Sequence, residues 1–211
     1  MAKIPQGILG GIKGKIGGII GTSWKGINVI KTAPLSVANP QTAGQVAQRT
    51  KFGNVVAFAV LILSVVIKPL WDRFASKQSG FNAFIQSNVS LFAAEMPVFG
   101  TGFIISKGKM ASTSISSLVA DAGASEVGLE WVDDSGSGYK LATDIPYAVV
   151  INHTQGTVNS YESLSNRENE EINIPLDSAL VAGDVIDAYL AFKRADGTIV
   201  SNTSSETGVS A

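Results

Sequence analysis

The stretch GDVIDAYLAFKRADGTIVSNTS, residues 183–204, decides the fold of the chain. Its first part alternates through Val185, Asp187, Tyr189 and Ala191, which is the period of a β-strand. The Ala-Asp-Gly-Thr run at 195–198 then supplies the residue types of a hairpin turn. A strand followed at once by a tight turn indicates antiparallel pairing rather than a parallel crossover.

The rest of the chain after Gly100 has the same texture. Short β-branched stretches separated by Gly, Asp, Asn and Ser indicate seven strands, and the spacing favours an antiparallel sandwich of immunoglobulin type over residues 101–211. These stretches are FIIS, STSIS, VGLEWV, YAVVIN, EINIPL, DVIDAYLAF and TIVSNTS.

The first hundred residues read differently, beginning with a glycine-rich arm. In GGIIGTSWKGINVIK, two apolar runs flank Trp24-Lys25-Gly26, and glycine there can adopt the positive φ of a tight turn. We therefore expect a β-hairpin, followed by an extended connector between Pro34 and Pro40. The overall expectation is an α+β chain, with an assembly domain of arm, hairpin and helices at 1–100 and an immunoglobulin-like β-sandwich at 101–211.

Two helices are predicted within this first domain. One begins at Thr42, where Thr-Ala-Gly-Gln fits a capping box, and continues into the uncharged run Val55–Ile67, with Pro69 placed to end it. A second begins near Ser79 and ends before Pro97. One helical face contains Phe81, Phe84, Ile85, Asn88, Leu91 and Phe92, and we expect it to pack in the core.

The uncharged run VVAFAVLILSVVI raises the question of a membrane. A spanning helix needs about 20 apolar residues, whereas this run has thirteen. The length favours a helix buried inside a bundle or a subunit contact, and we do not expect a transmembrane span.

The formal net charge of −1 conceals a division between the halves. Residues 1–110 carry twelve basic and two acidic residues, and residues 111–211 carry four basic and fifteen acidic ones, for net charges of +10 and −11. Three readings stay open: a basic half that meets nucleic acid or an anionic surface, a basic part that docks on the acidic part of another copy, or two solvated parts. We favour docking between proteins. Nucleic acid, bound without sequence specificity, stays open as a further partner.

The sequence offers little for catalysis or metal binding. There is no Cys and one histidine, His153, so neither a triad nor a zinc set has its usual residues. Acidic residues that could form a calcium site or a glycosidase dyad lie at Asp133, Asp134, Asp144, Glu168, Glu170 and Glu171. Adjacent carboxylates on a strand point to opposite faces, so we interpret them as exposed loop and edge residues, and His153 as a turn residue.

The N-terminal blocks MAKIPQGILGGIKGKIGGIIGTSWKGINVIKTAP and NPQTAGQVAQRTKF resemble a family of uncharacterised bacterial and phage proteins of unknown function. The matching positions are Gly14 to Gly17, Trp24 to Gly26 and Pro40 to Arg49, and GLEWVDD with residues 183–204 resembles that family's second half. The resemblance brings no activity, but its phage and prophage settings favour a virion component. The C-terminal half separately looks like an immunoglobulin or fibronectin type III module.

We therefore expect a non-enzymatic structural protein that assembles through heterologous subunit contacts into a phage-like virion, a capsid or tail accessory layer, or a tube. It would be made in the bacterial cytoplasm and have other protein subunits as partners, as a homo-oligomer or within a larger particle. The alternative is a cell-surface adhesion module with an immunoglobulin-like recognition domain. We expect no catalytic residue, metal or cofactor, and place the assembly interface at Ile16, Ile19, Trp24, Lys25, Arg49, Phe52 and Trp71.

Overall fold

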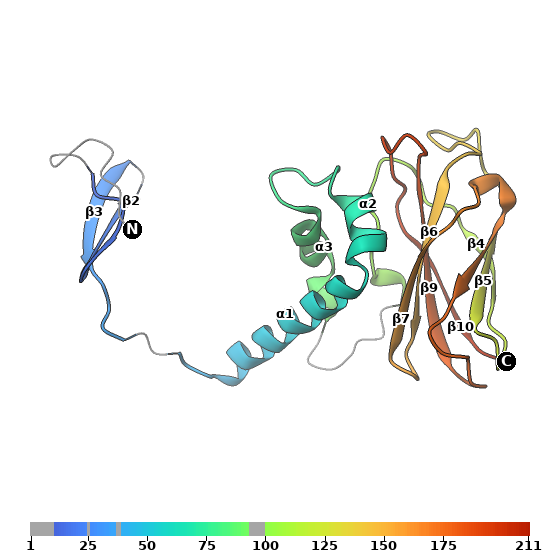
Figure 1. Ribbon diagram of the computed structural model, residues 1–211, viewed down its shortest axis with the longest axis horizontal. Helices are drawn as coiled ribbons and strands as arrows, with labels where there is room; N and C mark the ends of the chain where they lie inside the picture. The colour runs from blue at the N-terminus through green and yellow to red at the C-terminus, as the bar shows by residue number, and fades with distance from the viewer. Residues whose placement is uncertain (1–10, 25, 37–38, 93–99) are drawn as a thin grey trace. The chain divides into compact units, whose positions relative to one another are not determined.

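A computed structural model describes residues 11–24, 26–36, 39–92 and 100–211 of the chain (Figure 1). The chain forms two compact units, Met1–Thr42 and Ala43–Ala211. The boundary thus falls where the first helix begins, and not near residue 100 as the sequence led us to expect. The reason is that the helices share a hydrophobic core with the strands that follow them.

The first unit contains a three-stranded antiparallel sheet in the order β1-β2-β3. Its strands are β1 (Gly14–Ile16), β2 (Ile19–Trp24) and β3 (Ile27–Thr32). The β2–β3 hairpin is the predicted one, and Gly26 has the positive φ of 84° that its turn requires. The residue pattern alone did not indicate strand β1. It pairs with β2 because the chain reverses at Gly17, where φ is 55°.

The second unit begins with the helical segments α1 (Ala43–Leu61), η1 (Leu63–Ile67, a π-helical turn), α2 (Lys68–Trp71), α3 (Gly80–Asn88) and η2 (Val89–Leu91, a 3₁₀ turn). The start of α1 follows Thr42 directly, as predicted. Helix α3 starts after Ser79, whose hydroxyl oxygen accepts a hydrogen bond from the Asn82 backbone N–H at 3.3 Å.

Pro69 does not end the helix, contrary to the prediction. The helical axis instead bends by 72° between Ala43–Leu61 and Leu63–Trp71. Pro69 lies in the first turn of α2. Proline is tolerated there because the backbone N–H groups of a first helical turn have no acceptor within the helix.

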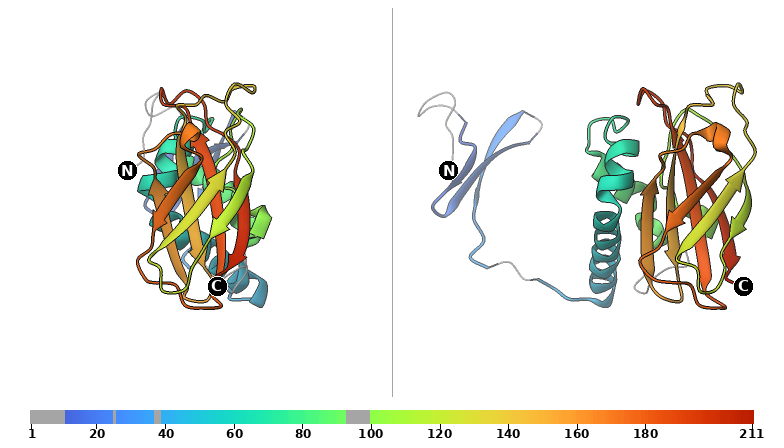
Figure 2. Two further views of the ribbon diagram at one scale, coloured as in Figure 1. Left: turned by 90° about the vertical axis from the view of Figure 1, so that its right-hand side faces the viewer. Right: turned by 45° about the vertical axis from the view of Figure 1, so that its right-hand side comes forward.

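The remaining strands are β4 (Ile115–Val119), β5 (Glu126–Trp131), β6 (Ile145–Asn152), β7 (Thr157–Glu162), β8 (Glu171–Pro175), β9 (Val185–Lys193) and β10 (Ser204–Val209). They form two antiparallel sheets, ordered β4-β5-β8 and β10-β9-β6-β7 (Figure 2). In a constant-type immunoglobulin domain the fourth strand joins the first sheet. Here the fourth strand of the sandwich, β7, pairs with β6 in the other sheet.

The strand predictions were right for most stretches and wrong for two. FIIS, at 103–106, is irregular, and the backbone N–H groups of Ile105 and Ser106 both donate to the Thr203 hydroxyl. The polar stretch TVNSYE forms β7, which the sequence analysis missed. TIVSNTS becomes a regular strand only from Ser204 onward.

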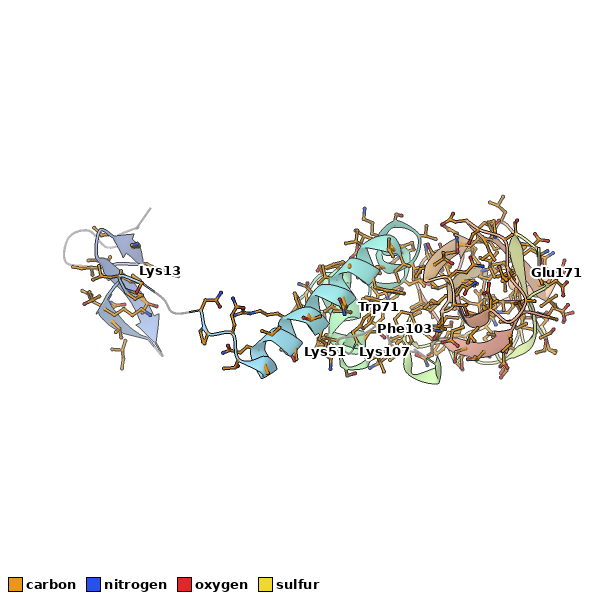
Figure 3. The ribbon with its side chains drawn as sticks, turned by 90° about the horizontal axis from the view of Figure 1, so that it is seen from below. Lys13, Lys51, Trp71, Phe103, Lys107 and Glu171 are labelled. Atoms are coloured by element: carbon orange, nitrogen blue, oxygen red, sulfur yellow. The ribbon has the colours of Figure 1, made fainter. Side chains whose placement is uncertain are left out.

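The sheet β10-β9-β6-β7 is the middle of three layers. One of its faces packs against the helices through Tyr147, Val149, Ile151, Tyr189 and Ala191. Its other face packs against β5 and β8 through Ala148, Val150, Ile186, Ala188, Leu190 and Phe192. Trp71 and Phe103 belong to the helical side of this core (Figure 3), and the Trp71 Nε1–H donates to the Ile105 carbonyl at 2.7 Å.

Candidate functional site

The sheet of the first unit has almost no buried interior. Of its described residues only Gly21 is buried, and all six residues of β3 are exposed. Ile27 and Ile30 are 62% and 63% exposed. A small sheet of this kind needs a hydrophobic face packed against another element for independent stability. The first unit therefore presents an apolar surface that suits a partner.

One face of this sheet carries a row of two lysines around an isoleucine. Lys15 pairs with Ile20 on one side, and Ile20 pairs with Lys31 on the other, so all three side chains share a face. Ile27 and Val29 lie on the same face by the alternation of β3. We call this face, defined by Lys15, Ile20, Ile27, Val29 and Lys31, the lysine face.

The opposite face is partly covered by the chain that leads into β1. A Cβ atom added at Gly21 would lie 2.1 Å from the Ile12 carbonyl oxygen, and one added at Gly11 would lie 2.6 Å from the Asn28 side chain. Gly21 and Asn28 both belong to this face. Gly11 and Ile12 therefore lie over it, and among the described residues of the first unit nothing comparable covers the lysine face.

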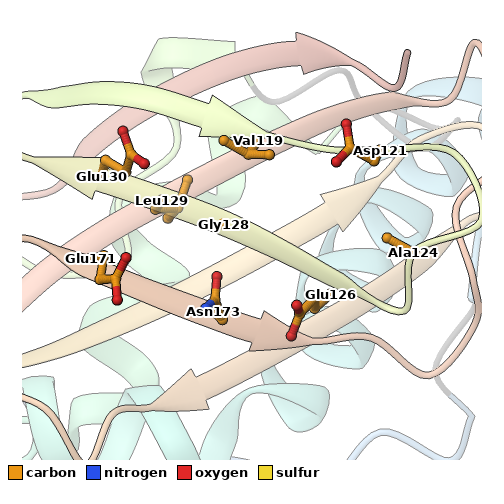
Figure 4. Close-up of a pocket in the computed structure, with 9 residues that line it drawn as sticks. All are labelled: Val119, Asp121, Ala124, Glu126, Gly128, Leu129, Glu130, Glu171 and Asn173. Atoms are coloured by element: carbon orange, nitrogen blue, oxygen red, sulfur yellow. The ribbon is translucent and has the colours of Figure 1, made fainter.

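A second exposed surface lies on the outer face of sheet β4-β5-β8. Glu126, Gly128 and Glu130 alternate outward along β5, while Val127 and Leu129 point into the core. Glu171 on β8 is directly opposite Glu130. These residues line a groove together with Val119, Asp121, Ala124, Leu129 and Asn173 (Figure 4). We call it the acidic groove, and no Lys or Arg occurs in its three strands.

The expected interface residues fall in several environments. Ile16 and Ile19 are 47% and 49% exposed and lie on the partly covered face of the first sheet. Trp24 ends β2, but its side chain and all of Lys25 lie outside the described residues.

The remaining three expected residues lie in the helices. Arg49 and Phe52 are exposed on α1, where Phe52 is 52% exposed. Trp71 is 6% exposed and packs edge-on against Phe84, so it is a core residue rather than an accessible one. Sequence reasoning missed Lys15, Lys31 and the β5 glutamates, although the period-two pattern Glu-x-Gly-x-Glu was readable.

The acidic residues considered for catalysis take part in ion pairs and hydrogen bonds within the second unit. Asp134 pairs with Lys140 and with Arg167, and Asp144 also pairs with Arg167. Asp133 accepts hydrogen bonds from Ser135, and its own backbone N–H donates to Glu170.

The fully buried Arg167 is the centre of this network. Its Nη1 lies 2.7 Å from Asp134 Oδ1, and its Nη2 lies 3.3 Å from Asp144 Oδ2. Burial by itself raises the pKa of Asp134, but the hydrogen bond from Lys140 and the charges of Arg167 and Lys140 outweigh it and lower the pKa. These groups connect loops at one end of the sandwich.

His153 lies in a turn, as predicted, and it contacts a buried carboxylate that the sequence did not reveal. Its Nε2 is 2.8 Å from Asp187 Oδ2, and the Thr207 hydroxyl donates to Asp187 Oδ1 at 2.6 Å. Burial opposes ionisation of Asp187, yet the hydrogen bonds from Thr207, His153 and the Gly100 N–H lower its pKa. Burial and the adjacent Asp187 raise the pKa of Tyr189, so this phenol stays protonated.

In the ranges 11–24, 26–36, 39–92 and 100–211, no three His, Asp or Glu side chains gather as a metal site would require. In the same ranges no single helix is long and apolar enough to cross a membrane. Ala43–Leu61 and Leu63–Trp71 reach that length and composition only as a pair bent by 72°.

Comparison with protein families gives a match over most of the chain. Residues 11–206 match the model of a family described as a family of unknown function, DUF6266. No curated protein matches the chain. The matched range includes the sheet of the first unit and nearly all of the second, so the family comprises both units.

Proposed function

The chain belongs to the family of unknown function DUF6266, and we propose that it is a non-enzymatic structural subunit that assembles through its first unit. The observation that carries this proposal is the exposure of that unit's sheet. Ile27, Val29 and Ile30 are between 38% and 63% exposed, and the described part of the unit has no apolar core. Burying one such side chain contributes about 1.5–3 kcal/mol, so a partner surface would stabilise the unit substantially.

The second unit supplies a rigid body for such an assembly. Its middle sheet is covered on both faces, and its buried Lys140 and Arg167 pair with Asp134 and Asp144. The first unit is joined to it by residues 33–42, which precede the first helix and include Pro34 and Pro40. The residue before each of these prolines, Ala33 and Asn39, is biased away from helical geometry.

The test is the size of the full-length protein as a function of its concentration. We expect light scattering and negative-stain microscopy to show assemblies, and the variant Ile27→Asp/Val29→Asp to remain monomeric. The control is Leu164→Asp, because Leu164 is 98% exposed on the second unit and should leave assembly unchanged. Wild-type protein that stays monomeric at every concentration and salt level would exclude the proposal.

The setting that we propose is a phage-like particle, as a capsid or tail accessory layer or a tube. The similarity of the N-terminal blocks to proteins of phage and prophage settings supports it. Immunolabelling of particles from a producing strain is the direct test. Label that follows the cell envelope in the absence of particles would instead support the alternative, a surface adhesion module.

A further inference from the structure

We propose that the acidic groove of one subunit is the docking surface for the lysine face of a second copy. This inference rests on the proposed assembly function and names the two surfaces that meet. The acidic groove is the outer face of sheet β4-β5-β8, and the inner face of that sheet packs in the sandwich core.

The charges of the two surfaces are complementary. Residues 1–42 contain five lysines and neither an acidic residue nor an arginine. Strands β4, β5 and β8 contain three glutamates and no basic residue. Among the described residues, Glu126, Glu130 and Glu171 make no ion pair within the chain, and neither do Lys15 and Lys31.

A like-charged pair in the groove points independently to a cationic partner. Glu130 and Glu171 are directly opposite each other on neighbouring strands, and Figure 4 shows both side chains on the groove side. Like charges in this position destabilise a sheet. An ammonium group placed between them would turn this repulsion into two favourable contacts.

The dimensions of the two rows agree. Lys15, Ile20 and Lys31 lie on three adjacent strands, so the two lysines are separated by two strand spacings, or about 10 Å. Glu126 and Glu130 are four residues apart on one strand, or about 13 Å. The flexible lysine side chains can cover the small difference.

A glycine lies at the middle of the acidic row, opposite the isoleucine of the basic row. A Cβ added to Gly128 would lie 3.2 Å from Asn173 Oδ1 and 3.4 Å from Val119 Cβ, so the two cross-strand neighbours already lean over the glycine. The Ile20 side chain would therefore rest on Val119 and Asn173 when the lysine row lies along β5.

The proposed contact is heterologous, because it joins different surfaces of the two copies, and repeated head-to-tail contacts of this kind give rings or filaments. Within the second unit, Glu171 lies on the side away from the helices (Figure 3).

The experiment uses full-length proteins with reversed charges. The acceptor variant is Glu126→Lys/Glu130→Lys, and the donor variant is Lys15→Glu/Lys31→Glu. Each alone should require at least a tenfold higher concentration for half-maximal assembly. An equimolar mixture should restore assembly, because each surface in the mixture again meets one of opposite charge. The control Asp177→Lys/Glu206→Lys makes the same charge change outside the groove and should assemble like the wild type.

The outcomes separate this inference from the function on which it rests. An acceptor variant that assembles like the wild type would overturn the groove as the docking surface, while assembly itself would still support the proposed function. In a further outcome, the mixture fails to assemble, but a single chain that carries all four substitutions forms the contact between residues 15 and 31 and the groove. This result would show docking within a chain and overturn the second copy as occupant. Wild-type protein that never assembles would remove both proposals.

Discussion

The variant Arg167→Met measures how strongly the second unit depends on its buried charges. Arg167 and Asp144 are both 0% exposed, and the Arg167 guanidinium also stacks 3.8 Å from the centre of the Phe192 ring. Methionine would retain much of the packing but leave the Asp144 carboxylate buried without its cation. Removing one partner of a buried ion pair costs about 3–5 kcal/mol. For a unit of this size that corresponds to a fall in Tm of about 6–20 °C.

Thermal and urea unfolding followed by circular dichroism would measure this loss. Arg73→Met is the matched control, since Arg73 is exposed and donates one hydrogen bond to the Gly197 carbonyl; we expect a change below about 0.5 kcal/mol. The double variant Asp144→Leu/Arg167→Met removes both charges and should recover part of the stability. A loss below about 1 kcal/mol for Arg167→Met would refute a structural role for the pair.

Three further predictions follow from particular contacts. Because the pKa of Asp187 is lowered in the folded state, its stabilising contribution is present above its unfolded pKa of about 3.9 and is lost as the pH falls through the folded pKa. Urea unfolding between pH 7 and pH 2 should therefore show a smaller decrease in the free energy of unfolding for Asp187→Asn than for the wild type. Gly108→Ala would place a Cβ 1.9 Å from the Val200 carbonyl oxygen, so we expect a loss of about 1–3 kcal/mol in urea unfolding, and an unchanged midpoint would contradict the close contact. Gly53→Ala meets no atom within 4 Å on α1, so the same measurement should show a gain of about 0.5–1 kcal/mol, and a loss would indicate a contact at that position.

The sequence predicted the α+β class and most strands because these follow from local patterns. The β2–β3 hairpin, the start of α3 at Ser79 and the turn at 195–198 each depend on a few neighbouring residues. Strand β7 was missed because it lies at a sheet edge, where Thr157–Glu162 needs few apolar residues to pair with β6.

The domain boundary could not be predicted from local patterns. Strands β6 and β9 are buried on both faces, and in Tyr147–Ile151 five apolar residues follow one another without alternation. Such a run indicates a covered second face but does not say what covers it. The Phe84 and Phe92 face of the second helix was correctly assigned to a core, and only the structure shows that this core includes the sheet.

The sequence indicated the charges of the candidate surfaces but not which residues form them. The opposite charges of the two halves are a property of composition, and they pointed to docking between proteins. The lysine face depends on strand register, which brings Lys15 and Lys31 to either side of Ile20 although they are sixteen positions apart in the chain. Without strand β1, which the residue pattern alone did not indicate, Lys15 had no place in a sheet.

The two units differ in what holds them together. The second unit has two hydrophobic clusters, and its buried Arg167 pairs with the buried Asp144, although Phe52, Val60 and Leu61 of α1 remain more than half exposed. In the first unit the described strands gain backbone pairing but bury little apolar surface, and the conformational entropy of ordering them is of order 1–2 kcal/mol per residue. Contact with a second copy would supply the missing burial, so ordering and docking of this unit would form one equilibrium. Part of the free energy of docking would then offset the entropy cost of ordering the first unit. The net affinity would be lower for this reason, and the contact would stay reversible although its apolar and charged parts are both favourable.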